Sequence, residues 1–324
     1  MKKIKLNFLF VFIVFFIGCG QSNERNNQVN GIPSVGEDIS GVIKISGSSS
    51  MYNMVLKLSD EFMKIAPKVK ILVQNNNSGK GMNDVMTGSA DIAMVSRCQA
   101  DNEKKCFFIP IAKDAVLPII SFDNYFLQEI VLHGITKSQL TDIFITGKIK
   151  TWGQLLKNNN PSPIKIYTRG DTSGTAETWA NFLGKSQKDI KGTSVKDEQQ
   201  MLDNISKDPL AIGYCSLSNA YNLNTGYHKK EIYILPIDFN SNKQLDDNEA
   251  FYDKHSQIIK AINSGFLPAP PARDLYFVCK AKPSDKKILA FIRWVITTGQ
   301  NYIEPSGNVY IQKENARLTL ESLK

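Results

Sequence analysis

Along most of the chain, short apolar runs alternate with segments whose apolar residues recur every three or four positions. A short run predicts a strand, and the wider spacing predicts a helix with one buried face. Strands are predicted at 42–45, 69–73, 91–95, 164–168, 211–215 and 275–279, and helices at 51–65, 82–86, 135–144, 179–183, 258–262 and 288–296. This alternation is typical of an α/β fold with mostly parallel sheets flanked by helices.

The first 40 residues break this pattern. Three lysines, at positions 2, 3 and 5, precede ten residues without a polar side chain, Phe8 to Ile17. A membrane span needs about 20 apolar residues, so this shorter run is typical of a signal peptide instead. We predict a signal peptide at 1–18 and a flexible tether at 19–40, because the chain after Cys19 turns polar and rich in Asn.

The apolar run ends with Phe16-Ile17-Gly18-Cys19, which resembles a bacterial lipobox except for Phe16 in place of the usual Leu. The resemblance implies that Cys19 is lipidated and becomes the first residue of the mature chain. We therefore expect an exported protein that its lipid anchors to the bacterial membrane, on the periplasmic face or the cell surface.

Composition narrows the class of protein. The 324 residues are 42% hydrophobic and 22% charged, which excludes wholesale disorder and a multi-span membrane protein and favours two domains. The formal charge of +8 falls to +5, from 36 basic and 31 acidic residues, without the three N-terminal lysines. That excess is too small and too diffuse to predict nucleic-acid binding.

The remaining cysteines give no sign of redox or metal chemistry. None of Cys98, Cys106, Cys215 and Cys279 forms a CxxC pair, and the chain has only three histidines. We expect structural cysteines, paired or free, and no metal or cofactor. Export permits disulfides, so a bond between Cys98 and Cys106 stays open.

Three turns place Ser, Thr and Gly where a helix is predicted to begin, at 47–50, 78–81 and 173–175. The first amides of a helix lack internal partners and carry partial positive charge, so such a turn can bind an anion. For any single turn, helix capping is the simpler interpretation. Arg169 precedes Ser173 by four residues and adds a fork of donors suited to an oxyanion, and Asp171 could hold that guanidinium. The spacing matches neither a Walker loop nor GxGxxG, which disfavours nucleotides.

Several motifs resemble the periplasmic-type phosphate-binding proteins that serve bacterial ABC importers. The segment Arg169-Gly170-Asp171-Thr172-Ser173-Gly174-Thr175 is similar to that family's phosphate signature, and Ser49-Ser50-Met51 and Asn77-Ser78-Gly79 align with its other binding turns. Further likenesses lie at 88–93, 141–152 and 211–214. The resemblance implies a two-lobed, type II periplasmic-binding-protein fold joined by a hinge, with lobe I at 41–118 and 272–324 and lobe II at 119–271.

The resemblance also implies a binding site and partners. The phosphate ligands would be Ser50, Met51, Ser78, Ser96, Arg169, Ser173, Gly174 and Thr175, with Asp171 and Arg97 in support. Partners would be the phosphate ion, the permease subunits of an ABC importer and the membrane through the lipid on Cys19. We expect a monomer that binds no nucleic acid.

One position departs from the family pattern. Many members carry a carboxylate after the third strand that accepts the proton of phosphate, whereas this chain has Ser96 followed by Arg97. A serine hydroxyl can donate or accept, so it does not repel sulfate as a carboxylate would. An Arg beside a turn more often forms a structural ion pair than a ligand contact.

Other functions fit the sequence less well. Ser173 is not in a GxSxG motif and none of the histidines lies in a recognisable motif, so we do not expect an enzyme. Binding of another tetrahedral oxyanion, such as sulfate or molybdate, is one alternative. A surface lipoprotein of the same fold, acting in adhesion or interaction, is another, although it would have no need for the Arg169 motif. The three tryptophans fit helix cores better than a stacking platform for bases.

Overall fold

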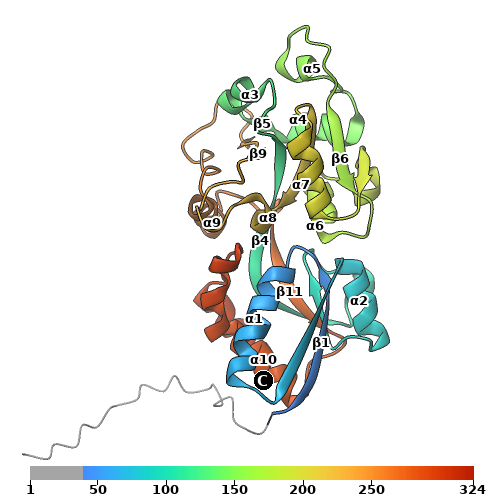
Figure 1. The fold of residues 1–324 in the computed structure, drawn as a ribbon, viewed down its shortest axis with the longest axis vertical. Helices are drawn as coiled ribbons and strands as arrows, with labels where there is room; N and C mark the ends of the chain where they lie inside the picture. Colours follow the sequence, from blue (N-terminus) through green and yellow to red (C-terminus); the bar gives the residue numbers. More distant parts are fainter. Residues whose placement is uncertain (1–38) are drawn as a thin grey trace, which may run out of the picture. The chain divides into compact units, whose positions relative to one another are not determined.

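The protein is described here by a computed structural model that covers residues 39–324. The expected signal peptide, nearly all of the tether and Cys19 lie outside the described residues. The described residues belong to one compact unit. Strands and helices alternate along the chain, which confirms the α/β class and its two lobes (Figure 1). The helix predicted at 135–144 is partly wrong, because Ile135 and Thr136 form a short strand before the helical residues begin at Lys137.

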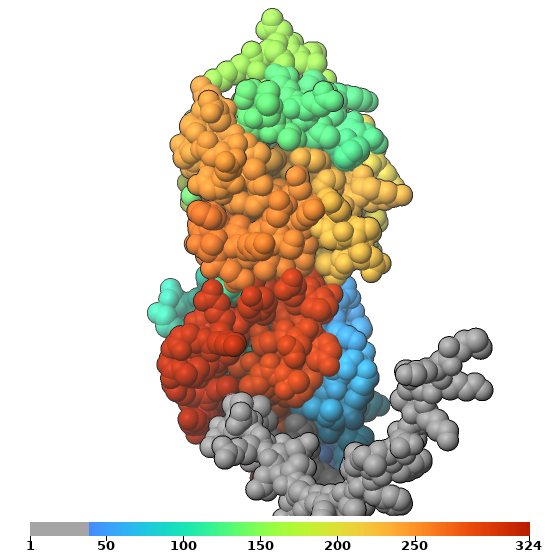
Figure 2. Space-filling model, turned by 90° about the vertical axis from the view of Figure 1, so that its left-hand side faces the viewer, coloured from blue at the N-terminus to red at the C-terminus, as the bar shows by residue number. Residues whose placement is uncertain are grey.

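The first lobe is built from segments at both ends of the described chain. Its β1 pairs in parallel with β2 on one side and β3 on the other. Figure 2 shows the C-terminal residues beside the N-terminal ones in this lobe. Its elements are β1 (Gly41–Ser48), α1 (Tyr52–Ile65), β2 (Val69–Asn76), α2 (Ser78–Thr87), β3 (Ile92–Val95), η1 (Asp101–Glu103), α10 (Lys286–Ile296), η4 (Thr298–Tyr302), η5 (Glu304–Ser306) and α11 (Lys313–Ser322).

The second lobe is formed by the middle of the chain. Its β6 pairs in parallel with β7 and β8, and a separate two-stranded sheet joins β5 to β10. Its strands are β5 (Ile135–Thr136), β6 (Lys165–Arg169), β7 (Thr193–Val195), β8 (Ala211–Ser216), β9 (Ile232–Ile234) and β10 (Ile237–Asp238). Its helices are α3 (Leu127–His133), α4 (Lys137–Thr141), the π-helix η2 (Asp142–Thr146), α5 (Trp152–Leu156), α6 (Gly174–Phe182), η3 (Gln187–Asp189), α7 (Glu198–Lys207), α8 (Leu217–Ala220) and α9 (His255–Ser264).

Two antiparallel strands carry the chain between the lobes. The 15-residue β4 (Phe107–Ser121) pairs with β11 (Ala272–Cys279) as far as Ala115 and with β8 from Val116 onward. One continuous sheet results, in the order β2-β1-β3-β11-β4-β8-β6-β7, with β9 also on β4. The alternation of apolar runs and helical segments did not reveal β4, whose residues are nearly all apolar and include Pro110 and Pro118.

Each lobe has its own aromatic core. In the first lobe, Phe62 of α1 packs against Phe291 and Trp294 of α10, with ring centroids 5.1 and 5.6 Å apart. In the second, Trp179 packs against Phe144 and Tyr214, at 5.4 and 5.5 Å. Apart from Tyr214, which lies on β8, these aromatic residues lie on helical faces that the apolar spacing marked, and all three tryptophans are buried, as expected. No helix within residues 39–324 is both long and apolar enough to cross a membrane.

The start of α2 is fitted tightly against the end of β1, and Gly81 makes this fit possible. A Cβ added there would lie 2.6 Å from the carbonyl oxygen of Ser46 and 2.7 Å from Cα of Gly47. We therefore expect Gly81→Ala to lower the free energy of unfolding by about 1–3 kcal/mol, because backbone must move to relieve the overlap. Denaturant-induced unfolding measures this change. Asn83→Ala, at an exposed position of α2, is the control, with an expected change within about 0.5 kcal/mol. Equal midpoints for the two variants would contradict the prediction.

Candidate anion-binding site

Three helices begin where a parallel strand ends, and their first residues face the same buried region. The helices are α1, α2 and α6, which follow β1, β2 and β6. Only one of the three predicted turns, at 173–175, contains a residue whose side chain caps the helix. Ser173 caps α6 by accepting from the N–H of Ala176 at 3.4 Å, whereas Asn77, not Ser78, caps α2. No side chain caps α1, where Met51 is buried and its N–H donates to the carbonyl of Ser48 at 3.1 Å.

The hydroxyls of the first lobe form a buried cluster. The Oγ of Ser48 lies 2.9 Å from that of Ser50 and 2.7 Å from that of Ser96. The hydroxyl of Ser78 accepts from the N–H of Ser96 at 3.2 Å. All four side chains are at most 4% exposed. The fold therefore brings Ser50, Ser78 and Ser96 together as the resemblance implied, and it adds Ser48, which the turn at 47–50 contained but the sequence did not single out.

The start of α6 closes this cluster from the second lobe. Gly174 lies so close that an added Cβ would collide with the hydroxyls of Ser96 and Ser78. Farther along the helix, Thr178 donates to the carbonyl of Ser96 at 3.4 Å. Ser218 on α8 reaches the carbonyl of Ser50 at the same distance. The two lobes are thus in contact around the hydroxyl cluster, and position 174 has no room for a side chain.

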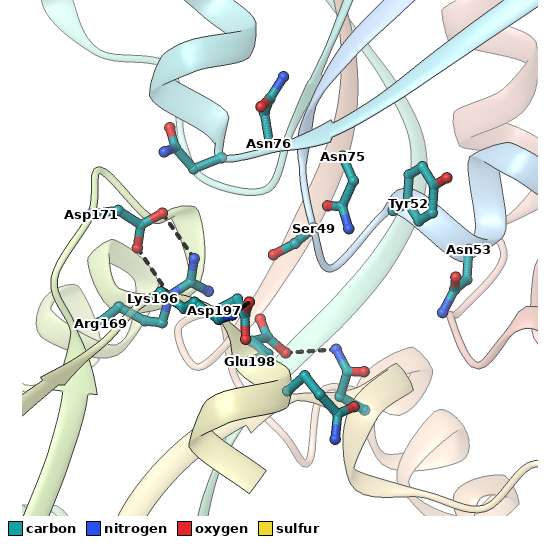
Figure 3. A pocket seen from close by; sticks show the side chains of 13 residues that line it. Ser49, Tyr52, Asn53, Asn75, Asn76, Arg169, Asp171, Lys196, Asp197 and Glu198 are labelled. Carbon is teal, nitrogen blue, oxygen red and sulfur yellow. Dashed lines mark hydrogen bonds and ion pairs between the residues drawn. The ribbon is translucent and has the colours of Figure 1, made fainter. Parts of the chain in front are cut away.

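Arg169 ends β6 and turns its guanidinium toward Asp171. The Nε and Nη2 atoms donate to the two carboxylate oxygens at 2.9 Å each, a planar two-bond pairing (Figure 3). The N–H of Arg169 also donates to the hydroxyl of Tyr214 at 3.2 Å. The arginine side chain is only 3% exposed, and its Nη1 makes no hydrogen bond to the described residues. Asp171 therefore fixes the fork and leaves one nitrogen available to a ligand.

The sequence reading missed Glu198, a buried carboxylate at the start of α7. It accepts from the hydroxyl of Thr175 at 2.6 Å, from the N–H and hydroxyl of Ser216 at 3.0 and 2.5 Å, and from Asn219 at 2.7 Å. Burial alone would raise the pKa of Glu198. The hydrogen bonds from Ser216 and Thr175, with the charges of Arg169 and Arg273, outweigh burial and place the pKa below its ordinary value.

An ionised Glu198 decides what Thr175 offers to a ligand. A carboxylate can only accept hydrogen bonds, so the hydroxyl hydrogen of Thr175 is committed to Glu198. The Oγ1 atom of Thr175 then presents lone pairs to the site, and its backbone N–H at the start of α6 is the donor that remains. In this structure the Thr175 hydroxyl therefore donates to Glu198 and not into the site.

Arg97 is committed to ion pairs beside the site. Its guanidinium donates to both oxygens of Glu103 at 2.7 and 2.5 Å and to the carbonyl of Cys98 at 2.9 Å. Its Nε lies 3.2 Å from Glu177 on α6, so the cluster also joins the two lobes. Arg97 thus has the structural role that an arginine beside a turn suggested.

A second buried ion pair joins β4 to β11 where these paired strands cross between the lobes. Arg273 of β11 donates to one oxygen of Asp114 on β4 through Nε at 3.1 Å and Nη2 at 2.5 Å. The two residues face each other in the strand register. Both are buried, and burial raises the pKa of Asp114 although Arg273 opposes the shift. The available signals were Asp114, inside a mostly apolar run, and Arg273, just before the strand predicted at 275–279.

A cleft of about 500 Å³ adjoins the buried cluster. Figure 3 shows Ser49, Asn75 and Asn76 of the first lobe on one side of this cleft, with Arg169 and Glu198 on the other. The complete lining comprises Ser49, Tyr52, Asn53, Asn75, Asn76, Asn77, Arg169, Asp171, Lys196, Asp197, Glu198, Gln199 and Asn219. Within residues 39–324 there is no group of three or more His, Cys, Asp or Glu that could hold a metal ion. The described cysteines, Cys98, Cys106, Cys215 and Cys279, are all free thiols.

The site and the crossing strands define a two-lobed binding protein of the periplasmic type. Residues 32–298 match the family model described as a PBP superfamily domain, and the chain belongs to that superfamily.

Named relatives and solved structures agree with this assignment. A Bacillus subtilis protein named phosphate-binding protein PstS is 29% identical over 221 residues, which cover 67% of this chain and 72% of that protein. A Staphylococcus epidermidis protein of the same name is 27% identical over 299 residues, covering 89% and 85%. A Clostridium perfringens structure, described as a putative phosphate ABC transporter substrate-binding protein with bound phosphate, is 21% identical with a TM-score of 0.68 over 84% of this chain and all of that one.

The hydrogen bonds to Glu198 predict a specific dependence of stability on pH. Because its folded-state pKa lies below the ordinary value of about 4.3, ionised Glu198 stabilises the fold above that pH. That stabilisation is lost as the pH falls through the lowered pKa. We expect Glu198→Gln to cost about 1–3 kcal/mol at pH 7 and the cost to shrink at acid pH. Urea unfolding at a series of pH values measures it.

Glu177→Gln is the comparison with the opposite sign. Burial raises the pKa of Glu177, against the charge of Arg97. The wild-type protein should therefore gain stability relative to this variant as the pH falls. The same pH trend in both variants would contradict the assignment of an ionised Glu198.

Proposed function

We propose that this protein binds inorganic phosphate in the cell envelope and delivers it to an ABC importer. The observation that carries the proposal is the convergence of three helix N-termini and the Arg169–Asp171 pair on one buried cluster of hydroxyls between two lobes. Helix-start amides and hydroxyls supply donors for an oxyanion without solvent, and a guanidinium fork supplies charge and geometry. The names of the relatives from Bacillus and Staphylococcus support phosphate as the anion.

The binding residues in this proposal come from both lobes. The first lobe contributes Ser50, Met51, Ser78 and Ser96, and the second contributes Arg169, Ser173, Gly174 and Thr175. Asp171 holds Arg169, and Arg97 stiffens the contact between lobes. We take lobe I as 41–118 with 272–324 and lobe II as 119–271. With these limits the hinge lies near the point where β4 and β11 cross between the lobes. Closure around the ion shifts an equilibrium between open and closed forms, and the closed form is what the permease recognises.

The proposal includes an envelope location. A signal peptide at 1–18 directs export, and lipid on Cys19 anchors a monomer through the polar segment that follows. The role is binding and delivery, without catalysis and without a cofactor. A protein that acts in adhesion alone would not need a buried site with so many hydrogen-bond donors for an anion. We therefore favour transport as the function.

Calorimetric titration tests the proposal directly. The purified protein is unfolded and refolded to remove carried-over ligand, and it is titrated with phosphate and then with phosphate in excess sulfate. We expect one-to-one binding of phosphate that sulfate does not abolish. Competition by sulfate at equal concentration would make the protein a general oxyanion binder, and no binding of either ion by folded protein would refute the proposal.

Arg169 is expected to provide most of the ligand's charge balance. We predict that Arg169→Ala weakens phosphate binding by at least a hundredfold while the protein still unfolds cooperatively, because Asp171 is half-exposed and can be solvated. Calorimetry measures the affinity, and circular dichroism measures unfolding. Lys185→Ala removes one positive charge from an exposed position just after α6 and should leave affinity within about threefold. Equal affinity of Arg169→Ala and wild type would remove Arg169 from the site.

Thr175 should make a smaller contribution. We expect Thr175→Val to cost about 1–3 kcal/mol of binding free energy, because the buried carboxylate of Glu198 beside the site then loses the hydrogen bond that the Thr175 hydroxyl donates. Titration of Thr175→Ser, which restores the hydroxyl, should recover most of the loss; failure to recover would show that the hydroxyl is not the group concerned.

A further inference from the structure

Arg273 reaches more of the candidate site than any other charged side chain outside the predicted set. Its Nη1 donates to the carbonyl of Ser96 at 2.8 Å. Its Nη2 lies 3.3 Å from the hydroxyl oxygen of Ser50 and 3.3 Å from that of Thr175. The side chain is 3% exposed. One guanidinium therefore contacts three of the eight residues proposed to bind phosphate, and these residues come from both lobes.

Asp114 holds Arg273 in this position. One of its carboxylate oxygens accepts from Nε and Nη2 of the arginine, and the other accepts from the N–H of Leu217 at 3.0 Å. Asp114 is fully buried, so the carboxylate has no freedom to follow a mobile partner. The remaining Nη2 hydrogen and the Nη1 group then face the hydroxyl cluster from a fixed direction.

A purely structural pairing would not need these outward contacts. Arg97 illustrates the difference, because within the described residues its guanidinium contacts only carboxylates and a backbone carbonyl. Arg273 instead directs Nη2 at two hydroxyl oxygens that belong to the starts of α1 and α6. An oxyanion seated between those helix starts would accept from the same nitrogen. Thr175 strengthens the point, since its own hydroxyl hydrogen is committed to Glu198.

We propose that Arg273 is a second anion-binding arginine of this site, held by Asp114 at the crossing of β4 and β11. This inference rests on the proposed function and deepens it. Arg169 approaches the ligand from the second lobe, and Arg273 approaches it from the strands that join the lobes. Nη2 of Arg273 contacts Ser50 of the first lobe and Thr175 of the second, so both contacts form together only when the lobes are closed. Arg273 thereby links ligand binding to closure.

The test compares three variants with the wild-type protein by phosphate calorimetry and by unfolding without ligand. Arg273→Lys keeps the charge but loses the planar fork. The double variant Arg273→Met with Asp114→Asn removes both charges of the buried pair together, so that neither is left unpaired, and keeps an acceptor for Leu217. Arg293→Lys is the control, since Arg293 is a half-buried arginine of α10 that donates to the carbonyl of Leu323 at 3.1 Å, away from the site.

We expect Arg273→Lys and the double variant to unfold cooperatively and to bind phosphate at least tenfold more weakly than wild type. Arg293→Lys should bind within about threefold. Binding within threefold of wild type by either folded Arg273 variant would overturn the inference and give Arg273 a purely structural role. An equal loss of affinity in Arg293→Lys would also overturn it. A wild-type protein that binds no phosphate would refute the proposed function itself, which separates the two failures.

Discussion

The pairing of β4 with β11 joins the two lobes and sets the register from which the site is assembled. These antiparallel strands form part of each lobe's sheet, and they connect two hydrophobic cores that would otherwise be separate. Their register sets Asp114 opposite Arg273 at the point where β4 changes partner. The starts of α1, α2 and α6 can face one another only because this crossing fixes the two sheets in one continuous order.

The charged side chains of the site are held in ion pairs or by hydrogen bonds. Arg169 is held by Asp171 and Arg273 by Asp114, while Glu198 is satisfied by hydroxyl, amide and N–H donors. Two guanidiniums thus face three carboxylates, so the site has no net positive charge, and each guanidinium acts on an anion through its local charge and its directed donors. Selectivity has to come from directed N–H and O–H groups in a region without solvent, where an unmatched donor costs more than it does in water. Fixed donors also favour one tetrahedral geometry over loosely held ions.

Hydrogen-bond direction refines the roles of individual residues. Ser173 acts as a helix cap, but Ser50 and Ser78 do not, because α1 lacks a side-chain cap and Asn77 caps α2. These two hydroxyls are therefore free to face Ser48 and Ser96. Thr175 is bound to Glu198 and offers an acceptor. The Ser and Thr residues of three similar turns thus have three different roles, which their positions along the chain do not distinguish.

Reading the sequence was enough to predict the α/β alternation, most of the helical faces that pack in each core and the Arg169–Thr175 turn. Those features are local, since apolar spacing and turn residues act over a few positions. The residues that complete the site, by contrast, are brought together by long-range contacts. Asp114 and Arg273 lie 159 positions apart, and Thr175 and Glu198 lie 23 apart. Such contacts depend on strand order and register, and β4, which supplies that register, is a mostly apolar stretch interrupted by Lys113 and Asp114. A buried charge inside such a stretch is visible in the sequence, but its partner is fixed only when distant strands pair.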